Sequence, residues 1–256
     1  MRVTVLGCGS SAGVPQINGG WGACDPENPK NRRRRSSILL QSETSDLLID
    51  CPPDCREQLL GIGLERVDGV LFTHAHADHC HGIDDLRWIN MAMGKDIPVY
   101  GRSDHLDLIE HKFSYAFEPL KEGAKRFYYK PMLLRNDIMD SCLVGDLDLT
   151  VFEQDHGFSS TLGIRVGDFA YSTDAVKLNE AAFMALEGVK VWIVDCFRYE
   201  QHHTHSWLEQ TLKWIERVNP ERAILHHMGR QMDYDTVMGD TPEHVEPGYD
   251  GMIIEV

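Results

Sequence analysis

The sequence has no uninterrupted apolar segment of about 18 residues, the length that a membrane-spanning helix requires. Basic residues are also scarce, with 25 lysines and arginines against 40 aspartates and glutamates, so the formal net charge is -15. A surface of that sign repels polyanions, and we expect neither a membrane nor a nucleic acid as partner. We expect a cytoplasmic protein, because the apolar run after Met1 is too short for a signal sequence.

The seven cysteines are too scattered to form a disulfide framework. Their number is odd and no two have CxxC spacing, which is typical of reduced thiols inside a cell. The chain also lacks a linker rich in proline, glycine or serine, a low-complexity tract and a repeat of fixed period. We therefore predict that residues 1–256 form one domain, whose 42% apolar content can fill a single large core.

Short apolar runs predict many strands, and helical spacing predicts five helices between them. The early strands, followed by strands that alternate with helices, predict an α/β fold with two sheets face to face and helices outside, a four-layer αββα sandwich. Residues 112–146 have the weakest periodicity, and we expect an inserted loop or a cap over a site there. The predicted strands are 3–6, 37–40, 47–49, 69–72, 99–100, 147–152, 162–166, 169–172, 189–194, 223–225 and 252–254, and the helices are 53–60, 83–93, 105–113, 179–186 and 206–218.

Histidine is abundant, with 13 among 256 residues, and three histidines crowd into THAHADHC directly after the apolar run at 70–72. On an extended backbone His74 and His76 point to one side, whereas Asp78 and His79 follow where the strand must turn. Imidazole and carboxylate are usual ligands of zinc, manganese and iron, and this many in six residues suit two adjacent ions. A solvated turn is the alternative, but an unpaired polar group beside a buried strand costs about 1–3 kcal/mol.

Four further polar residues each follow an apolar run, at the strand ends where rigid scaffolds carry chemistry. They are Asp50, His156, Asp174 and His227. His226 competes with His227, since adjacent strand residues face opposite ways and only one of them can be a ligand.

With these motifs the sequence resembles the metallo-β-lactamase-fold hydrolases, whose HxHxDH signature stands here at residues 74–79. The segments GCGSSAGVP, YSTDAVKL, HSWLEQTL and RAILHHM resemble the phosphodiesterase branch, meaning tRNase Z and above all the phosphoribosyl 1,2-cyclic phosphate phosphodiesterases of phosphonate breakdown. The resemblance covers nearly the full chain. It departs at residues 17–29, which hold only Cys24 where those enzymes carry a cysteine-rich zinc knuckle.

The resemblance implies two divalent metal ions per chain, zinc or manganese, with iron also compatible. It assigns His74, His76 and His156 to one ion, Asp78, His79 and His227 to the other, and Asp174 to both. His227 is chosen over His226 because family members commonly carry a threonine at the preceding position. Asp50 would orient a ligand or the bridging water.

Two ions about 3.5–4 Å apart hold a bridging hydroxide and neutralise charge on a phosphoryl oxygen, so the implied activity is phosphodiester hydrolysis. The leaving oxygen then needs a proton, and EQHHTHSW offers His202, His203 and His205. His205 stands where phosphodiesterases of this fold carry a histidine that is not a ligand, and the resemblance makes it the general acid. The predicted catalytic residues are therefore His205, Asp78 and Asp50.

Four arginines at 32–35 form the densest basic run, which is either a solvated face or a clamp for a substrate phosphate. The predicted substrate-binding residues are Arg34, Arg35, Ser10, Ser11 and His203. The expected substrate is a small cyclic or linear sugar or nucleotide phosphodiester. The alternatives are a tRNase Z-like endoribonuclease, for which no long Lys/Gly-rich arm is present, and a metal-binding module without turnover. Related enzymes often form homodimers, and the resemblance leaves a homodimer open.

Overall fold

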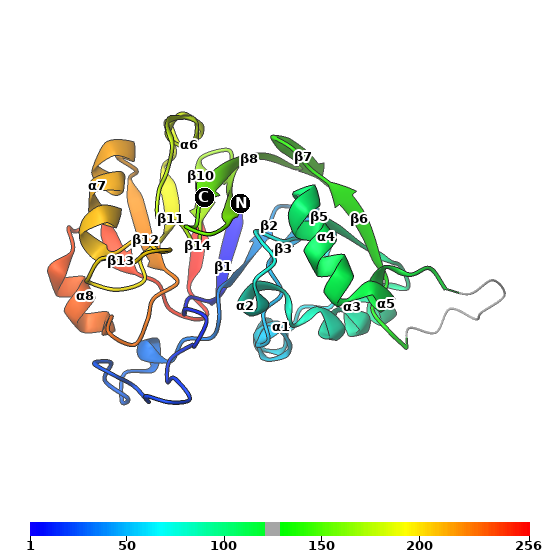
Figure 1. Ribbon diagram of the computed structural model, residues 1–256, viewed down its shortest axis with the longest axis horizontal. Coiled ribbons are helices and arrows are strands. Elements are labelled where there is room, and N and C mark those ends of the chain that lie inside the picture. The colour runs from blue at the N-terminus through cyan, green and yellow to red at the C-terminus, as the bar shows by residue number, and fades with distance from the viewer. Residues whose placement is uncertain (121–128) are drawn as a thin grey trace.

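The computed structural model describes residues 1–120 and 129–256, and it confirms the predicted fold of two sheets with helices outside (Figure 1). Each sheet has seven strands in the described residues. The first sheet contains β1 (Arg2–Gly7), β2 (Ser37–Gln41), β3 (Asp46–Ile49), β4 (Gly69–Leu71), β5 (Ile97–Gly101), β6 (Leu133–Asp137) and β14 (Ile253–Glu255). The second contains β7 (Ser141–Val144), β8 (Leu147–Asp155), β9 (Ser160–Val166), β10 (Phe169–Ser172), β11 (Val191–Asp195), β12 (Arg222–His226) and β13 (Val245–Pro247). The helices are η1 (Pro29–Asn31), α1 (Cys55–Ile62), α2 (Ala77–Cys80), η2 (Ile83–Asp85), α3 (Leu86–Met93), α4 (Ser103–Lys112), α5 (Ser114–Phe117), α6 (Glu180–Ala185), α7 (Leu208–Val218) and α8 (Tyr234–Asp240).

Each sheet joins an antiparallel half to a parallel half. The orders are β14-β1-β2-β3-β4-β5-β6 and β13-β12-β11-β10-β9-β8-β7, and the parallel pairs run from β3 to β6 and from β10 to β13. The carboxyl ends of parallel strands share one edge of a sheet, which is where α/β proteins bind ligands. The topology therefore collects the loops that follow β3, β4, β10, β11 and β12.

The core follows from the alternation of side chains along each strand. In β3, Leu47 and Ile49 pack in the cluster between the two sheets, whereas Leu48 packs in the cluster beneath the helices of the first sheet. All three are at most 1% exposed. Burying each such side chain stabilises the fold by roughly 1.5–3 kcal/mol, so a strand with both faces covered reads as a continuous apolar run.

The expectation of an inserted loop or cap at residues 112–146 is wrong for the described part of that segment. It supplies the edge strands β6 and β7, which pair with β5 and β8 in different sheets. Residues 121–128, which belong to the same segment, lie outside the described residues. Most side chains of β6 and β7 are exposed or half-buried, so these strands carry no apolar run to reveal them.

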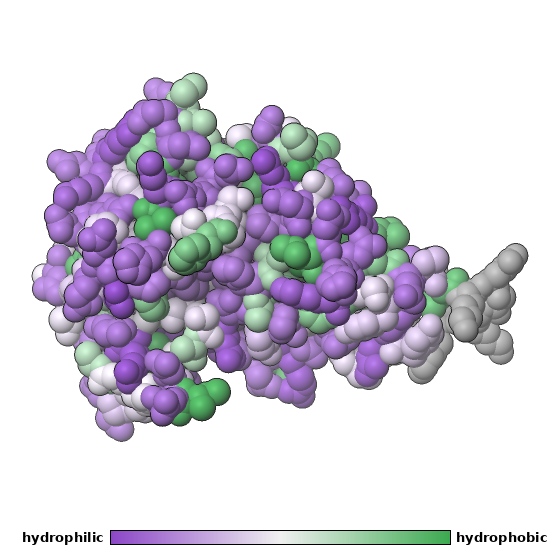
Figure 2. Space-filling view, viewed as in Figure 1, coloured by the Kyte–Doolittle hydropathy of each residue, from purple (hydrophilic) through white to green (hydrophobic). Residues whose placement is uncertain are grey.

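The outer surface is mainly polar, and hydrophilic side chains cover most of the face seen in Figure 2, with apolar ones in small separate patches. Within residues 1–120 and 129–256, no helix has both the length and the apolar character needed to cross a bilayer.

Candidate metal centre and active site

The predicted ligands come from strand ends in both sheets. In the first sheet, the loop after β4 carries His74 and His76 and leads into α2, which holds Asp78 and His79. In the second sheet, His156, Asp174 and His227 follow β8, β10 and β12. The facing sheets thus bring residues together that lie up to 153 positions apart in the sequence, from His74 to His227.

Backbone strain is concentrated at this place. Among the described residues other than glycine, four have positive φ: Asp50 at 62°, Asp174 at 51°, His227 at 55° and Asn219 at 53°. Asn219 is the C-cap of α7, a common place for the left-handed conformation. The other three are predicted site residues, and strained backbone of this kind persists where the surrounding fold imposes it, often at functional sites.

Among the described residues, three groups of potential ligand atoms converge: Asp195, His205 and His227 form one of them, and the other two share one carboxylate. His74, His76, His156 and Asp174 form one group, Asp78, His79, Asp174 and His227 form the other, and the ligand atoms of each group lie within 4.8 Å of one another. The Nε2 atoms of His79 and His227 are 3.2 and 3.4 Å from Asp174 oxygens, and those of His74 and His156 are both 3.8 Å from Asp174 Oδ2. The structure therefore brings together all seven residues predicted as ligands.

The donor set fits cations. The Nε2 atoms of His74, His79 and His227 are buried and have no hydrogen-bond partner within the described ranges, an arrangement that costs free energy unless another group meets them. Burial lowers the pKa of His74 well below its usual value, which keeps the imidazole neutral and its lone pair available. Burial also lowers the pKa of His156.

Asp50 contacts the ring of His79, one of the predicted ligands. One of its oxygens accepts the Thr73 hydroxyl at 2.8 Å and lies 2.7 Å from His79 Nδ1, and the other accepts the Thr73 backbone N–H at 2.8 Å. A carboxylate on Nδ1 directs Nε2 of the same ring toward the shared group at Asp174. Asp50 is fully buried, as the predicted orienting role requires.

His226 and His227 separate at the end of β12, where His226 is the last strand residue and His227 follows it with a φ of 55°. His226 Nε2 lies 3.2 Å from the Tyr171 hydroxyl in the core, and burial lowers the pKa of His226 to about 3. His227 turns the other way, with its Nε2 atom 3.7 Å from Asp78 Oδ2. Only His227 joins the ligand groups.

His205 lies against the predicted ligands, and its side chain is 12% exposed. Its ring stacks on His227 at 4.6 Å between centroids and lies 4.8 Å from the His156 ring. Its Nδ1 atom is 3.4 Å from Asp195 Oδ2, a carboxylate that the sequence interpretation missed. Burial acts most strongly on the pKa of His205 and lowers it, but Asp195 and two further carboxylates together raise it above the usual value.

Asp195 could have been found, because it ends the apolar strand VWIVD in the same way that Asp50 follows LLI. Its Oδ2 atom accepts the backbone N–H groups of Ala175 at 3.0 Å and Ser206 at 3.1 Å. The carboxylate thereby ties the loop after Asp174 to the loop that carries His205. Its other oxygen is 3.7 Å from His227 Nδ1.

The predicted substrate-binding residues are dispersed around this centre. Ser10 is buried and donates its backbone N–H to Met228 at 3.2 Å, directly beside His227. Ser11 is exposed, and its carbonyl accepts from Arg35 Nε at 3.3 Å. His203 is exposed, with its ring 6.4 Å from that of His202. None of the three belongs to the ligand groups of the described residues.

The arginine run lines a cleft of about 700 Å³ between the loop of residues 12–17 and α1. Arg34 pairs with Asp250 at 3.0 Å and Arg35 pairs with Asp54 at 2.7 Å. Arg33 is only 2% exposed and donates to the carbonyls of Gly229 at 3.3 Å and Met232 at 2.6 Å. The arginine run therefore stabilises the fold through contacts within the protein, and the substrate-binding role of Arg34 and Arg35 stays a prediction.

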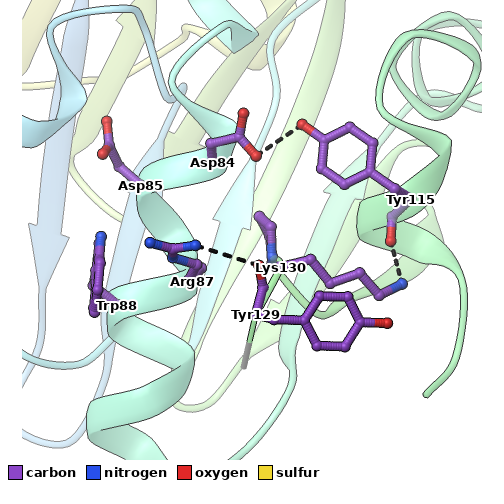
Figure 3. Close-up of a pocket in the computed structure, with 8 residues that line it drawn as sticks. Asp84, Asp85, Arg87, Trp88, Tyr115, Tyr129 and Lys130 are labelled. Carbon is purple, nitrogen blue, oxygen red and sulfur yellow. Dashed lines mark hydrogen bonds between the residues drawn. The ribbon is translucent and has the colours of Figure 1, made fainter. Parts of the chain in front are cut away.

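A second cavity, of about 440 Å³, lies between α3 and the segment around Lys130 (Figure 3). Asp84 accepts the Tyr115 hydroxyl at 2.8 Å, Arg87 donates to the Tyr129 carbonyl at 3.3 Å, and Lys130 donates to the Tyr115 carbonyl. These side chains are therefore already engaged in hydrogen bonds within the chain. No predicted site residue lines this cavity.

Comparison with known proteins agrees with this geometry. A family model described as "Beta-lactamase superfamily domain" matches residues 46–228. The crystal structure described as a new diphosphatase from the PhnP family superposes with a TM-score of 0.91 at 27% identity, covering 100% of this chain and 97% of that one. These matches confirm the resemblance inferred from the motifs.

Two curated relatives are similar over part of their length. An octanoyltransferase of Porphyromonas gingivalis is 30% identical over 98% of this chain and 51% of that protein. A ribonuclease Z of Clostridium kluyveri is 25% identical over 68% of this chain and 49% of that protein. The chain thus matches about half the length of each relative, whose name describes the whole protein.

Proposed function

The chain belongs to the beta-lactamase superfamily domain family, and from that membership we propose that it is a metal-dependent phosphoric diester hydrolase acting on a small cyclic or linear sugar or nucleotide phosphodiester. The observation that carries the proposal is the pair of donor groups that share Asp174 and whose buried Nε2 atoms at His74, His79 and His227 have no hydrogen-bond partner among the described residues. We also propose that the protein works in the cytoplasm on a small-molecule substrate, as a monomer or a homodimer.

The residues that would hold two divalent cations are His74, His76 and His156 for one, Asp78, His79 and His227 for the other, and Asp174 for both. When bound, such cations supply a water nucleophile at neutral pH and neutralise negative charge on phosphoryl oxygens. Asp50 keeps the His79 ring in the orientation that this requires. Zinc and manganese both suit imidazole and carboxylate donors, as does iron.

His205 donates the proton to the departing alkoxide in this proposal. Its ring lies within 5 Å of the His156 and His227 rings, so a phosphoryl group at the centre would be within its reach. Asp195 favours the protonated form of His205, because its Oδ2 atom lies 3.4 Å from Nδ1 of that ring. Burial of the Asp195 carboxylate keeps water from competing for that contact.

A second candidate is hydrolysis of a diphosphate, and the similarity to the structure described as a diphosphatase favours it. Diphosphates and diesters make similar demands on a two-cation site and differ in the leaving group. A tRNase Z-like activity stays an alternative because of the similarity to ribonuclease Z, but the charge of -15 opposes a long nucleic acid. A binding module without turnover is the remaining alternative.

The test is hydrolysis by manganese- or zinc-loaded protein compared with chelator-treated protein. The substrates are bis(p-nitrophenyl) phosphate, a 2′,3′-cyclic nucleotide, a dinucleoside diphosphate and a precursor tRNA. Metal-dependent turnover of the two diesters supports the proposal, and turnover of only the diphosphate or only the RNA would replace it with that alternative. Stoichiometric metal without any turnover would leave the binding module.

A further inference from the structure

Phe158 is unusual among the aromatic residues that the structure describes. It is 96% exposed, whereas the next most exposed aromatic side chains, Tyr129 and Trp88, are 56% and 53% exposed. Single exposed apolar residues are common, and Ile17 at 97% is another. The position of Phe158 is what sets it apart, since it follows the predicted ligand His156 by two residues.

The turn that carries Phe158 is held rigidly. His156 donates its backbone N–H to Ser159 at 2.9 Å, and Phe158 donates its own to His156 at 3.1 Å. Gly157 donates to Asp155 Oδ1 at 2.7 Å. These bonds fix the backbone that carries the phenyl ring, which lowers part of the entropic cost of binding a ligand there.

The same turn packs against the loop of His205. His156 Nδ1 lies 2.7 Å from the Thr204 carbonyl oxygen, next to His205 in the chain. Gly157 has φ of 80°, and a Cβ there would lie 2.9 Å from the His203 carbonyl oxygen, so the two loops touch directly. Two residues of chain span at most about 7 Å, so the backbone of Phe158 lies near His156 and near the loop that carries His205.

An exposed phenyl ring at that place is suited to a flat partner. Aromatic rings stack on nucleobases of any sequence, and the contact does not depend on charge. That independence matters in a chain with a net charge of -15, which repels an anionic substrate beyond the metal centre. An aliphatic leaving group would gain much less from the ring.

We propose that Phe158 determines substrate specificity by stacking on a heterocycle of the leaving group, so that the site prefers nucleotide phosphodiesters over base-free sugar phosphodiesters. This inference rests on the proposed function, because it places the leaving group beside His205.

The test compares 2′,3′-cyclic AMP with glycerol 1,2-cyclic phosphate, which lacks a base, as substrates of the metal-loaded protein. Phe158→Ala and Phe158→Leu should raise KM for cyclic AMP about tenfold with little change in kcat, and Phe158→Trp should restore the wild-type KM. The matched control is Met184→Ala, which removes a 73% exposed apolar side chain on α6. Unchanged KM values, or equal losses for both substrates, would overturn the inference.

A binding measurement separates this inference from the proposed function. Calorimetry of adenosine 5′-monophosphate and ribose 5-phosphate should show that Phe158→Ala weakens only the adenine compound, again by about tenfold. If the wild type hydrolyses no phosphodiester, the proposed function fails, and this comparison still decides whether the ring stacks on a base. Equal affinity of the wild type for both compounds would contradict the stacking contact.

Discussion

At the carboxyl end of β4, buried imidazoles have ring nitrogens without hydrogen-bond partners in the part of the chain that the structure describes, whereas along residues 33–35 the guanidinium groups already donate to protein oxygens. His74 and His79 belong to the first region, and their Nε2 atoms lie 3.8 and 3.2 Å from oxygens of Asp174. Arg33 and Arg35 belong to the second, and each has protein acceptors at 2.6–2.7 Å. Both stretches are dense in polar residues, and Arg33 Nε is also buried without a partner among the described residues, so neither density nor one unpaired atom marks a site; several unpaired ring nitrogens that converge on one carboxylate do.

The largest effect is expected on kcat, from a substitution beside the histidines of the first region. His205→Ala should keep its metal content and lower kcat for a phosphodiester by about 10²–10⁴-fold, because no group then protonates the leaving oxygen. Steady-state kinetics and metal analysis measure the two quantities. The matched control is His111→Ala, an exposed histidine on α4, which should keep wild-type kcat. Full activity of His205→Ala would remove the assignment of the general acid.

Asp50 contacts His79 of the first region, and Asp54 pairs with Arg35 of the second, so the two aspartates allow matched substitutions. Asp50→Asn should weaken metal affinity about 10–100-fold, since it disturbs the contact that orients His79. Asp54→Asn removes only the partner of Arg35 and should leave metal affinity unchanged. Competition with a chromogenic chelator measures both. Equal affinities in the two variants would show that Asp50 does not support the centre.

Arg33 is the most buried member of the second region. Arg33→Met should destabilise the fold by about 2 kcal/mol, because the carbonyls of Gly229 and Met232 lose their donor inside the protein. Urea unfolding of the metal-loaded protein measures this loss. Wild-type stability of the variant would show that the Arg33 guanidinium does not stabilise the segment of residues 229–232.

Arg34 and Arg35 should give the smallest effects. Arg34→Ala and Arg35→Ala each remove a partly exposed ion pair, which stabilises the fold by less than about 1 kcal/mol. If the pair binds a substrate phosphate as predicted, KM for a phosphodiester rises a few-fold while the unfolding midpoint stays nearly constant. Unchanged KM in both variants would reduce the arginine run to a structural feature.

The sequence predicts the parts of the fold whose residues are buried on both sides. Strands such as β3 and β12 appear as continuous apolar runs, and their ends lead to Asp50 and His227. The edge strands β6 and β7 were missed because exposed faces carry polar residues that leave no periodic signal. Helix α8 was missed although Tyr234 and Val237 are buried at helical spacing and Asp233 accepts from Thr236 at its start, because a short segment that contains a glycine gives only a weak periodic signal.

For the site, the sequence predicts the candidate ligands but not all of the carboxylates that contact the neighbouring side chains. The crowded motif at 74–79 and polar residues after strands lead to all seven residues that converge. Asp195 carries the same strand-end signal, but its contact with His205 depends on the folded approach of β11 to the loop after it. The partners of the arginines could not be predicted either, because Asp250 lies 216 residues from Arg34.

The most direct test is the metal content of the purified protein and of Asp174→Asn. The carboxylate of Asp174 belongs to both donor groups, so the wild type should carry two divalent cations per chain and the variant fewer than one. A wild type without a stoichiometric cation, or a variant that keeps both ions, would contradict the shared metal centre.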